Sequence, residues 1–249
     1  MTVTEANHSD VDTSPVLLSE ILDLSALRAE IVQGFVVVRA HPEDATLRIL
    51  TYAKVTQILG RWYEVTKTCR GLIVRSAISV LSDAVVQARP WRKFFTLHQI
   101  TGGWALSDEE SETSLEAVEL DFDALAEVTD KVDGSMGILY RAPDGRAAFA
   151  TKGSFDSIQA RYFTAWMRRE PRFSEACEML LGDFPESTHI FELVGPGNQV
   201  VLHYENDDIV YLGSVNLRTG AYASSHEQRI EAISGNTRRG SWTRSTCAV

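Results

Sequence analysis

The pattern of apolar and polar positions divides the chain into a short helical start and a longer part rich in strands. Between Val16 and Ile31, apolar residues recur at helical spacing, which predicts a helix buried on one side. Short runs rich in β-branched residues follow, separated by Gly, Pro, Asp and Ser, and they predict strands. These runs are Phe35–Arg39, Leu47–Tyr52, Gly71–Arg75 and Ala84–Gln87.

The second half opens with a hairpin signal. Two strand-like runs, Ser135–Arg141 and Arg146–Lys152, flank Pro143-Asp144-Gly145, a tripeptide that suits a tight turn. Helices are then predicted over Ser157–Glu170 and Ser174–Leu181. Three more strands are predicted after them: His189–Val194, Gln199–Tyr204 and Ile209–Asn216.

Runs of strands with helices inserted predict an α+β fold with antiparallel sheet, rather than alternating βαβ units. With 249 residues and 44% apolar content, the chain can bury one substantial core or two small ones. We expect residues 1–15 to be disordered and residues 16–233 to form the folded domain. Residues 234–249 have no periodicity and little apolar content, which indicates an irregular tail.

Several classes of protein are excluded by composition. No apolar stretch approaches the length of a membrane helix, and the polar, acidic N-terminus does not resemble a secretory signal, so a cytoplasmic location is expected. Three widely spaced cysteines argue against a disulfide framework or a zinc site. We expect the thiol of Cys69 to be buried. The histidines without metal-ligand spacing, taken as structural, are His98, His189 and His203.

The net charge of −10 argues at first against a nucleic-acid partner. The charge is segregated, however. Ten acidic residues and no basic one lie between Lys93 and Lys131, whereas residues 61–93 carry seven Lys or Arg residues and only two acidic ones. A local basic field suits a phosphate, and two solvated faces of opposite sign explain the same pattern. Charge alone does not decide between them.

Lys131-Val132-Asp133-Gly134-Ser135 is the motif with the strongest chemical implication. An Asp-Gly turn directly before a predicted strand would place the lysine amine at the mouth of a sheet, and Gly134 would let a ligand approach the backbone. Neutral lysine is a nucleophile. A surface lysine before a β-turn remains the alternative reading of this motif alone.

Other segments add groups that suit a nucleotide. Arg70 and Gly71 open a strand, and residues 89–95 alternate cations with aromatics, a composition that suits gripping phosphate while stacking a base. Lys152 ends the second strand of the hairpin, and Glu192 is a lone carboxylate in an apolar strand. Taken singly, each has a structural alternative as a surface cation, a core aromatic or an ion-pair partner.

In this order, the segments resemble the phage-type ATP-dependent RNA ligase 1 family, within the lysine nucleotidyltransferase superfamily. The resemblance covers about residues 19–220 and rests on CRG, KFF, KVDGS, TKGS and FELVGPGNQVV. It implies an antiparallel-sheet nucleotidyltransferase domain with inserted helices, in which Lys131 becomes adenylated. It also implies that the nucleotide pocket is lined by Arg70, Lys93, Phe95, Gly134, Lys152 and Glu192.

The resemblance further implies ATP and Mg²⁺ as cofactors and RNA ends, including those of broken tRNA, as partners. Metal ligands and oligomeric state stay open. The family has a later Glu-Gly dipeptide and a lysine-x-lysine pair. Neither has a counterpart here, because no Glu-Gly follows Gly220 and no lysine follows Lys152. We therefore expect a domain incomplete at its C-terminus and an impaired activity. The alternatives are a non-catalytic nucleotide-binding remnant and, with only the lysine motif in common, a DNA ligase or capping-type enzyme.

Overall fold

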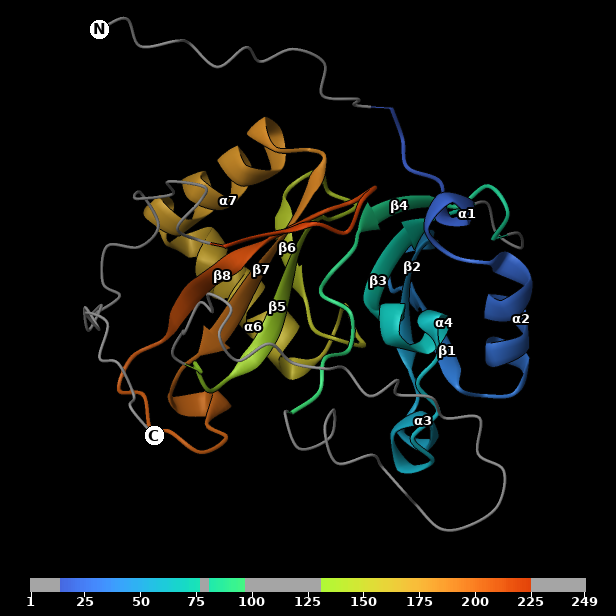
Figure 1. The fold of residues 1–249 in the computed structure, drawn as a ribbon. Helices are drawn as coiled ribbons and strands as arrows, with labels where there is room; N and C mark the ends of the chain where they lie inside the picture. The colour runs from blue at the N-terminus through green and yellow to red at the C-terminus, as the bar shows by residue number, and fades with distance from the viewer. Residues whose placement is uncertain (1–13, 77–80, 97–130, 225–249) are drawn as a thin grey trace, which may run out of the picture.

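The computed structural model describes residues 14–76, 81–96 and 131–224 (Figure 1). The acidic segment, His98 and the tail predicted from residue 234 lie outside these residues, as does most of the N-terminal stretch predicted to be disordered. The described chain contains two antiparallel sheets with helices on their outer sides, so the α+β prediction is confirmed. Within it, no helix combines the length and apolar character needed to cross a membrane.

The first sheet has four strands in the order β1-β2-β3-β4. Their bounds are β1 Val36–His41, β2 Asp44–Tyr52, β3 Arg70–Arg75 and β4 Val85–Ala88. All four strands predicted here are confirmed. Along β2 the side chains alternate between the two faces of the sheet, which is why Leu47 and Ile49 enter one apolar cluster and Leu50 another.

The single helix predicted over Val16–Ile31 is wrong, because the structure has two helices there, α1 Leu18–Ile21 and α2 Leu24–Val32. Leu22 is extended between them, and Asp23 accepts hydrogen bonds from the amides of Ser25 (2.7 Å) and Ala26 (3.1 Å). An N-cap at this point satisfies donors at the start of α2 and ends the first helix early. Two further short helices, α3 Lys54–Ile58 and α4 Glu64–Thr68, were not predicted.

The second sheet has five strands in the order β6-β5-β7-β8-β9. Their bounds are β5 Ser135–Arg141, β6 Ala147–Ala150, β7 Ser187–Val194, β8 Asp208–Asn216 and β9 Tyr222–Ser224. The predicted hairpin is confirmed, with Gly145 at φ +78° in its turn. Helices α6 Ile158–Arg169 and α7 Pro171–Asp183 follow it, and α7 begins before the predicted Ser174 because proline is accommodated in a first turn.

The predicted strand Gln199–Tyr204 is wrong. A 3₁₀ turn, η1 Pro196–Asn198, and an irregular stretch occupy this region. The amides of Val201 and Leu202 donate to the carboxylate of Asp133 instead of to a neighbouring strand. The apolar run at 200–202 is exposed, so its β-branched composition does not reflect burial in a sheet.

Three apolar layers hold the elements together. One lies between the first sheet and the N-terminal helices, and a second lies between the other sheet and α6 and α7. The third lies between the sheets and joins Ile49 and Ile73 of the first to Ile138 and Ile190 of the second. The order is therefore helix, sheet, sheet, helix, as Figure 1 shows, and the two sheets face each other directly.

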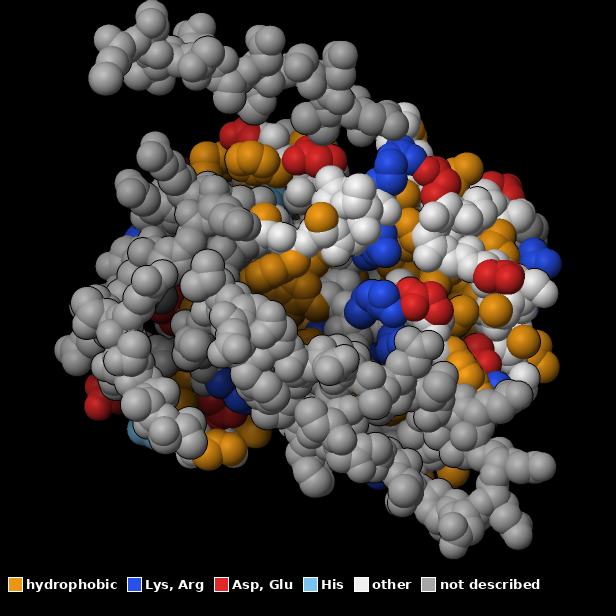
Figure 2. Space-filling model, in the orientation of Figure 1, with side chains coloured by type: hydrophobic (Ala, Val, Ile, Leu, Met, Phe, Trp, Pro, Cys, Tyr) orange, Lys and Arg blue, Asp and Glu red, His pale blue; other side chains and the backbone are white. Residues whose placement is uncertain are grey.

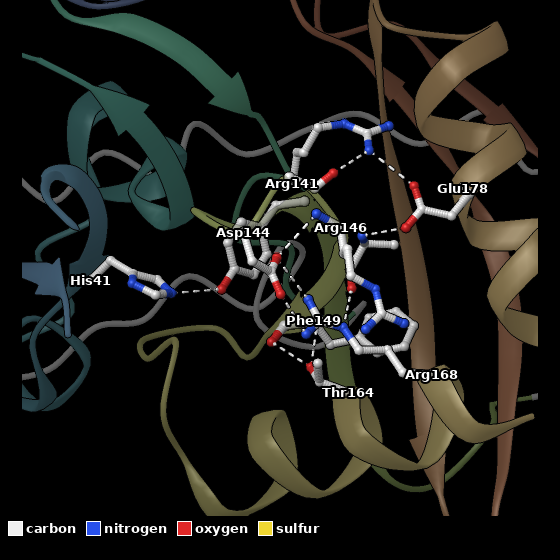
Figure 3. A network of polar contacts seen from close by, with 11 residues as sticks. His41, Arg141, Asp144, Arg146, Phe149, Thr164, Arg168 and Glu178 are labelled. Carbon is white, nitrogen blue, oxygen red and sulfur yellow. Dashed lines mark hydrogen bonds and ion pairs between the residues drawn. The ribbon is translucent and has the colours of Figure 1, made fainter. Parts of the chain in front are cut away.

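Polar contacts tie the β5–β6 hairpin to the two helices that cover it (Figure 3). From α6, Arg168 donates to the carbonyl of Ala147 (2.9 Å) and to both carboxylate oxygens of Asp144 (2.8 and 3.2 Å). From α7, Glu178 accepts from the amide of Ala147 (2.7 Å) and from Arg141 (2.9 Å). These contacts fix the hairpin at the end away from Lys131 and Lys152.

This network predicts how a substitution in α6 changes stability. Arg168→Ala removes three hydrogen bonds, two of them to a carboxylate, and should lower the free energy of unfolding by about 1–2 kcal/mol. The adjacent Arg169 is exposed, so Arg169→Ala is the matched control and should cost less than about 0.5 kcal/mol. Urea unfolding measures both. Equal costs for the two variants would show that the network does not stabilise the hairpin.

Candidate active site

Lys131, the predicted nucleophile, lies in an irregular stretch that leads directly into β5, as expected. Its side chain is 88% exposed, and its Nζ lies 3.9 Å from a carboxylate oxygen of Asp133, whose side chain is 10% exposed. The side chain of Asp133 is thus buried, while that of Lys131 extends into solvent. Residues 131–135 are called the nucleophile segment below.

Gly134 is required by the backbone next to it. A Cβ at this position would lie 2.3 Å from the carbonyl oxygen of Leu193 on β7. No side chain fits at that distance, so glycine lets the nucleophile segment lie against the strand that carries Glu192. From the sequence, Gly134 was predicted to let a ligand approach the backbone. In the structure, the close neighbour of Gly134 is strand β7.

Arg70 reaches the space between the sheets from the first residue of β3. The next residue, Gly71, has φ +95°, and a Cβ there would lie 2.4 Å from Cδ1 of Ile138 and 3.0 Å from the carbonyl of Lys152. The Arg70 guanidinium lies 3.3 Å from the sulfur of Met136 and 4.9 Å from the ring centroid of Phe94. Burial lowers the pKa of Arg70.

Lys93 and Phe95 lie on the extended segment that follows β4. The Lys93 amide donates to the carbonyl of Lys67 (2.8 Å), which anchors the segment on the end of α4. Lys93 Nζ donates to the Phe94 carbonyl (2.6 Å) and lies 4.6 Å from the ring centroid of Phe95. Phe95 in turn packs edge-on against Trp62, so it backs the lysine, while Phe94 is 61% exposed.

Lys152 follows β6 and meets Tyr52 from the other sheet. Its Nζ donates to the Tyr52 hydroxyl (3.1 Å) and lies 4.3 Å from the centre of that ring. The turn around Lys152 is held from the first sheet by Arg39, which donates to the Gly153 carbonyl (2.6 Å). Tyr52 was not among the predicted site residues, because only the facing of two sheets brings the end of β2 to this turn.

Glu192 lies on β7 opposite Met136, with Ile138 opposite Ile190 two residues further along. Paired residues share a face, so the Glu192 carboxylate points toward the first sheet, as the apolar side chains around it do. Burial raises the pKa of Glu192, and the charges of Lys131 and Arg70 and the Gly134 amide oppose this only in part. The predicted lone carboxylate in an apolar strand is therefore found.

Three cations, Arg70, Lys93 and Lys152, converge here. Burial lowers the pKa of Lys93, Tyr52 opposes the shift, and the nearby charges of Arg70 and Lys152 lower it further. Within the described residues, none of the three forms an ion pair with an acidic side chain. Figure 2 shows Lys and Arg side chains along the middle of one face, next to apolar and acidic ones. Such a cluster attracts a polyanion.

Several His and Cys side chains of the described residues are buried. The described residues contain no group of three or more His, Cys, Asp or Glu side chains that would hold a metal. His189 is buried and shares a hydrogen bond with Tyr211 (3.1 Å), in keeping with a structural role. Cys69 and Cys177 are buried and free, and burial raises the pKa of both thiols.

The predicted residues thus fall into connected groups. Arg70, Lys93 and Lys152 surround Tyr52, and Glu192 lies between Arg70 and the nucleophile segment. Phe95 lies behind Lys93, and Gly134 packs on β7. The sequence did not indicate Tyr52, nor Tyr204, whose hydroxyl accepts from the Asp133 amide (3.1 Å).

Comparison with known proteins agrees with this arrangement. A family model described as RNA ligase, of the phage T4 RNA ligase 1 type, matches residues 68–239, which is more than half of the 249 residues. The match includes every predicted site residue. A comparison with individual curated proteins finds no significant match. The chain belongs to the RNA ligase family of the T4 RNA ligase 1 type.

Proposed function

We propose that this domain transfers AMP from ATP to Lys131 and then to the 5′-phosphate of an RNA, whose 3′-hydroxyl partner displaces AMP to join the strands. The observation that carries the proposal is the meeting of Arg70, Lys93 and Lys152 around one tyrosine hydroxyl, beside Glu192 and the nucleophile segment. Broken tRNA is the RNA that the family resemblance favours.

The chemistry follows from the residues present. Lys131 Nζ, once neutral, forms a bond to the α-phosphorus of ATP as the bond to pyrophosphate breaks, and its proton is released to solvent. Arg70, Lys93 and Lys152 offset the charge on the phosphate oxygens. Phe94 and Phe95 offer aromatic surface to the base, and Glu192 is available to the ribose or to a metal.

Magnesium fits this set of residues in one way. A Mg²⁺ ion bound with a nucleotide takes one or two carboxylates plus phosphate oxygens, rather than a complete protein cage. Two carboxylates lie near Lys131: Asp133, with an oxygen 3.9 Å from Lys131 Nζ, and Glu192, whose pKa the charge of Lys131 affects. When bound, the ion would add positive charge where the phosphate groups are most negative.

One observation favours a second function, nucleotide binding without strand joining. No lysine follows Lys152 within these 249 residues, so the lysine pair that the family resemblance assigns to the leaving pyrophosphate is not among them. Removing one preorganised electrostatic contact costs on the order of 10²–10³ in rate. The following tests distinguish the two functions. Nucleotide binding alone would give a thermal shift without covalent label, whereas strand joining also requires the covalent label on Lys131.

The first test concerns the nucleophile. Incubation with magnesium and α-labelled ATP should label the chain with at most one AMP, in the acid-labile linkage expected of a phosphoramidate. Lys131→Ala should abolish labelling, and so should Lys131→Arg, because a guanidinium stays protonated and does not attack. Labelling that persists in Lys131→Ala would contradict the assignment, whereas a stabilising effect of ATP without label would favour the second function.

The second test concerns the cations. ATP should raise the melting temperature of the protein by mass action, and Lys93→Ala should reduce this rise at least twofold because it removes a phosphate partner. Lys54→Ala, at the exposed start of α3, changes the charge equally and should leave the rise unchanged. Scanning fluorimetry with ATP and GTP measures both effects. Equal stabilisation by GTP would point to a capping-type enzyme.

The third test uses the pH dependence of stability. The folded-state pKa of Glu192 is raised above its ordinary value of 4.5, so the carboxyl destabilises the fold progressively as pH rises through that range. Glu192→Gln should therefore raise the melting temperature of the ligand-free protein at pH 7 by about 1–3 °C. The gain should disappear near pH 4, and the rise caused by ATP should become smaller.

Glu175 is exposed on α7, so Glu175→Gln provides the control for charge removal. It should alter neither the pH dependence nor the response to ATP. Two results would contradict this prediction: Glu192→Gln is no more stable than the unmodified protein at pH 7, or it gains the same stability at pH 4. Either would show that the ionised Glu192 carboxylate does not lower the free energy of unfolding.

A further inference from the structure

The nucleophile segment is hydrogen-bonded to a loop that contains the wrongly predicted strand Gln199–Tyr204. This loop, residues 195–207, is called the clamp loop. One carboxylate oxygen of Asp133 accepts hydrogen bonds from the amides of Val201 (2.5 Å) and Leu202 (2.8 Å). In the opposite direction, the Asp133 amide donates to the hydroxyl of Tyr204 (3.1 Å). Asp133 is therefore held through both its side chain and its backbone.

A second link lies two residues further along the nucleophile segment. The Ser135 hydroxyl donates to Oδ1 of Asn198 (2.9 Å), and Nδ2 of Asn198 donates to the carbonyl of Leu193 (2.5 Å). Asn198 is only 7% exposed. It thus joins the start of β5, the end of β7 and the clamp loop in one buried contact.

The clamp loop has its own anchor. At its ends, Gly195 and Asp207 touch, since a Cβ on Gly195 would lie 2.1 Å from a carboxylate oxygen of Asp207. The other oxygen of Asp207 accepts from the hydroxyl of Tyr162 on α6 (2.6 Å). The loop is therefore closed at its base and fixed to a helix. A loop held in this way can transmit the rigidity of the domain to the segment it contacts.

The electrostatics agree with this anchoring. The amides of Leu202 and Val201 hold the pKa of Asp133 below its usual value, and Lys131 contributes to the same shift. In covalent catalysis the attacking atom must be held near its target, and a displacement of about 1 Å costs on the order of 100-fold in rate.

We propose that Tyr204 is a positioning residue for Lys131, acting through the backbone amide of Asp133. The inference rests on the proposed function, because it assigns Tyr204 to the adenylation of that lysine. Asp133 lies two positions after Lys131. Among the described residues, the Tyr204 hydroxyl accepts the hydrogen bond from the Asp133 amide.

Tyr204→Phe tests the proposal because it removes only the hydroxyl. In the full chain with magnesium and ATP, the rate constant for lysyl–AMP formation at saturating ATP should fall by about 10- to 100-fold. The ATP concentration at half-maximal rate should change less than twofold, since the cations that bind phosphate are untouched. Tyr222→Phe removes a hydroxyl that donates to the Leu212 carbonyl (3.2 Å) on β8 and is the matched control. It should leave both constants unchanged.

Hydrogen exchange provides a readout independent of catalysis. In Tyr204→Phe, the amides of Asp133, Val201 and Leu202 should exchange faster, while those of β7 stay protected. An unchanged rate of adenylation in Tyr204→Phe overturns the proposal and leaves the proposed function intact. If the unmodified chain takes no label, the proposed adenylation fails, and the assignment of Tyr204 fails with it; exchange then shows only whether the clamp forms.

Discussion

The close approach of the two sheets at Gly71 is the constraint on which the candidate site depends. An added Cβ would collide with Ile138 and with the backbone of Lys152 on the opposite sheet, so only glycine permits this spacing. Arg70 and Tyr52 from one sheet thereby face Lys152 and Glu192 from the other, above a layer of buried apolar side chains. Because that layer keeps water from the base of the site, charges there interact more strongly than on an open surface. Burial accordingly lowers the pKa of Lys93 and raises that of Glu192.

Features with a local cause could be predicted from the sequence. The strands of the first sheet, the hairpin around Gly145 and helix α6 all follow from apolar periodicity and turn residues, and the structure confirms them. Features that depend on contacts between distant segments could not. Tyr52 meets Lys152 across 100 positions of sequence, and nothing near either residue indicates it. The error at Gln199–Tyr204 has the same origin, since the carboxylate of Asp133 takes the amides that a neighbouring strand would have used.

The clustered cations reconcile a chain of net charge −10 with the proposed binding of phosphate. The charges of Arg70 and Lys152 act against that of Lys93, and the carboxylate of Glu192 beside them has a raised pKa. An arrangement of this kind costs folding free energy without a ligand and returns it when a polyanion binds, so its presence is better explained by binding than by stability. The aromatic rings of Tyr52, Trp62 and Phe95 contribute to holding the cations in place, since Lys93 and Lys152 lie over ring faces.

In the nucleophile segment, residues 133–135 are fixed by contacts, whereas the side chain of Lys131 is exposed. Asp133, Gly134 and Ser135 are each fixed to β7 or to the clamp loop, yet Lys131 extends from them with its side chain 88% exposed. A lysine that accepts a nucleotide from one substrate and passes it to another must be reached first by a triphosphate and then by an RNA end. In the proposed mechanism, a fixed backbone would keep the Lys131 nitrogen close to the cations during the first transfer. An exposed side chain would leave the phosphoramidate open to the second substrate.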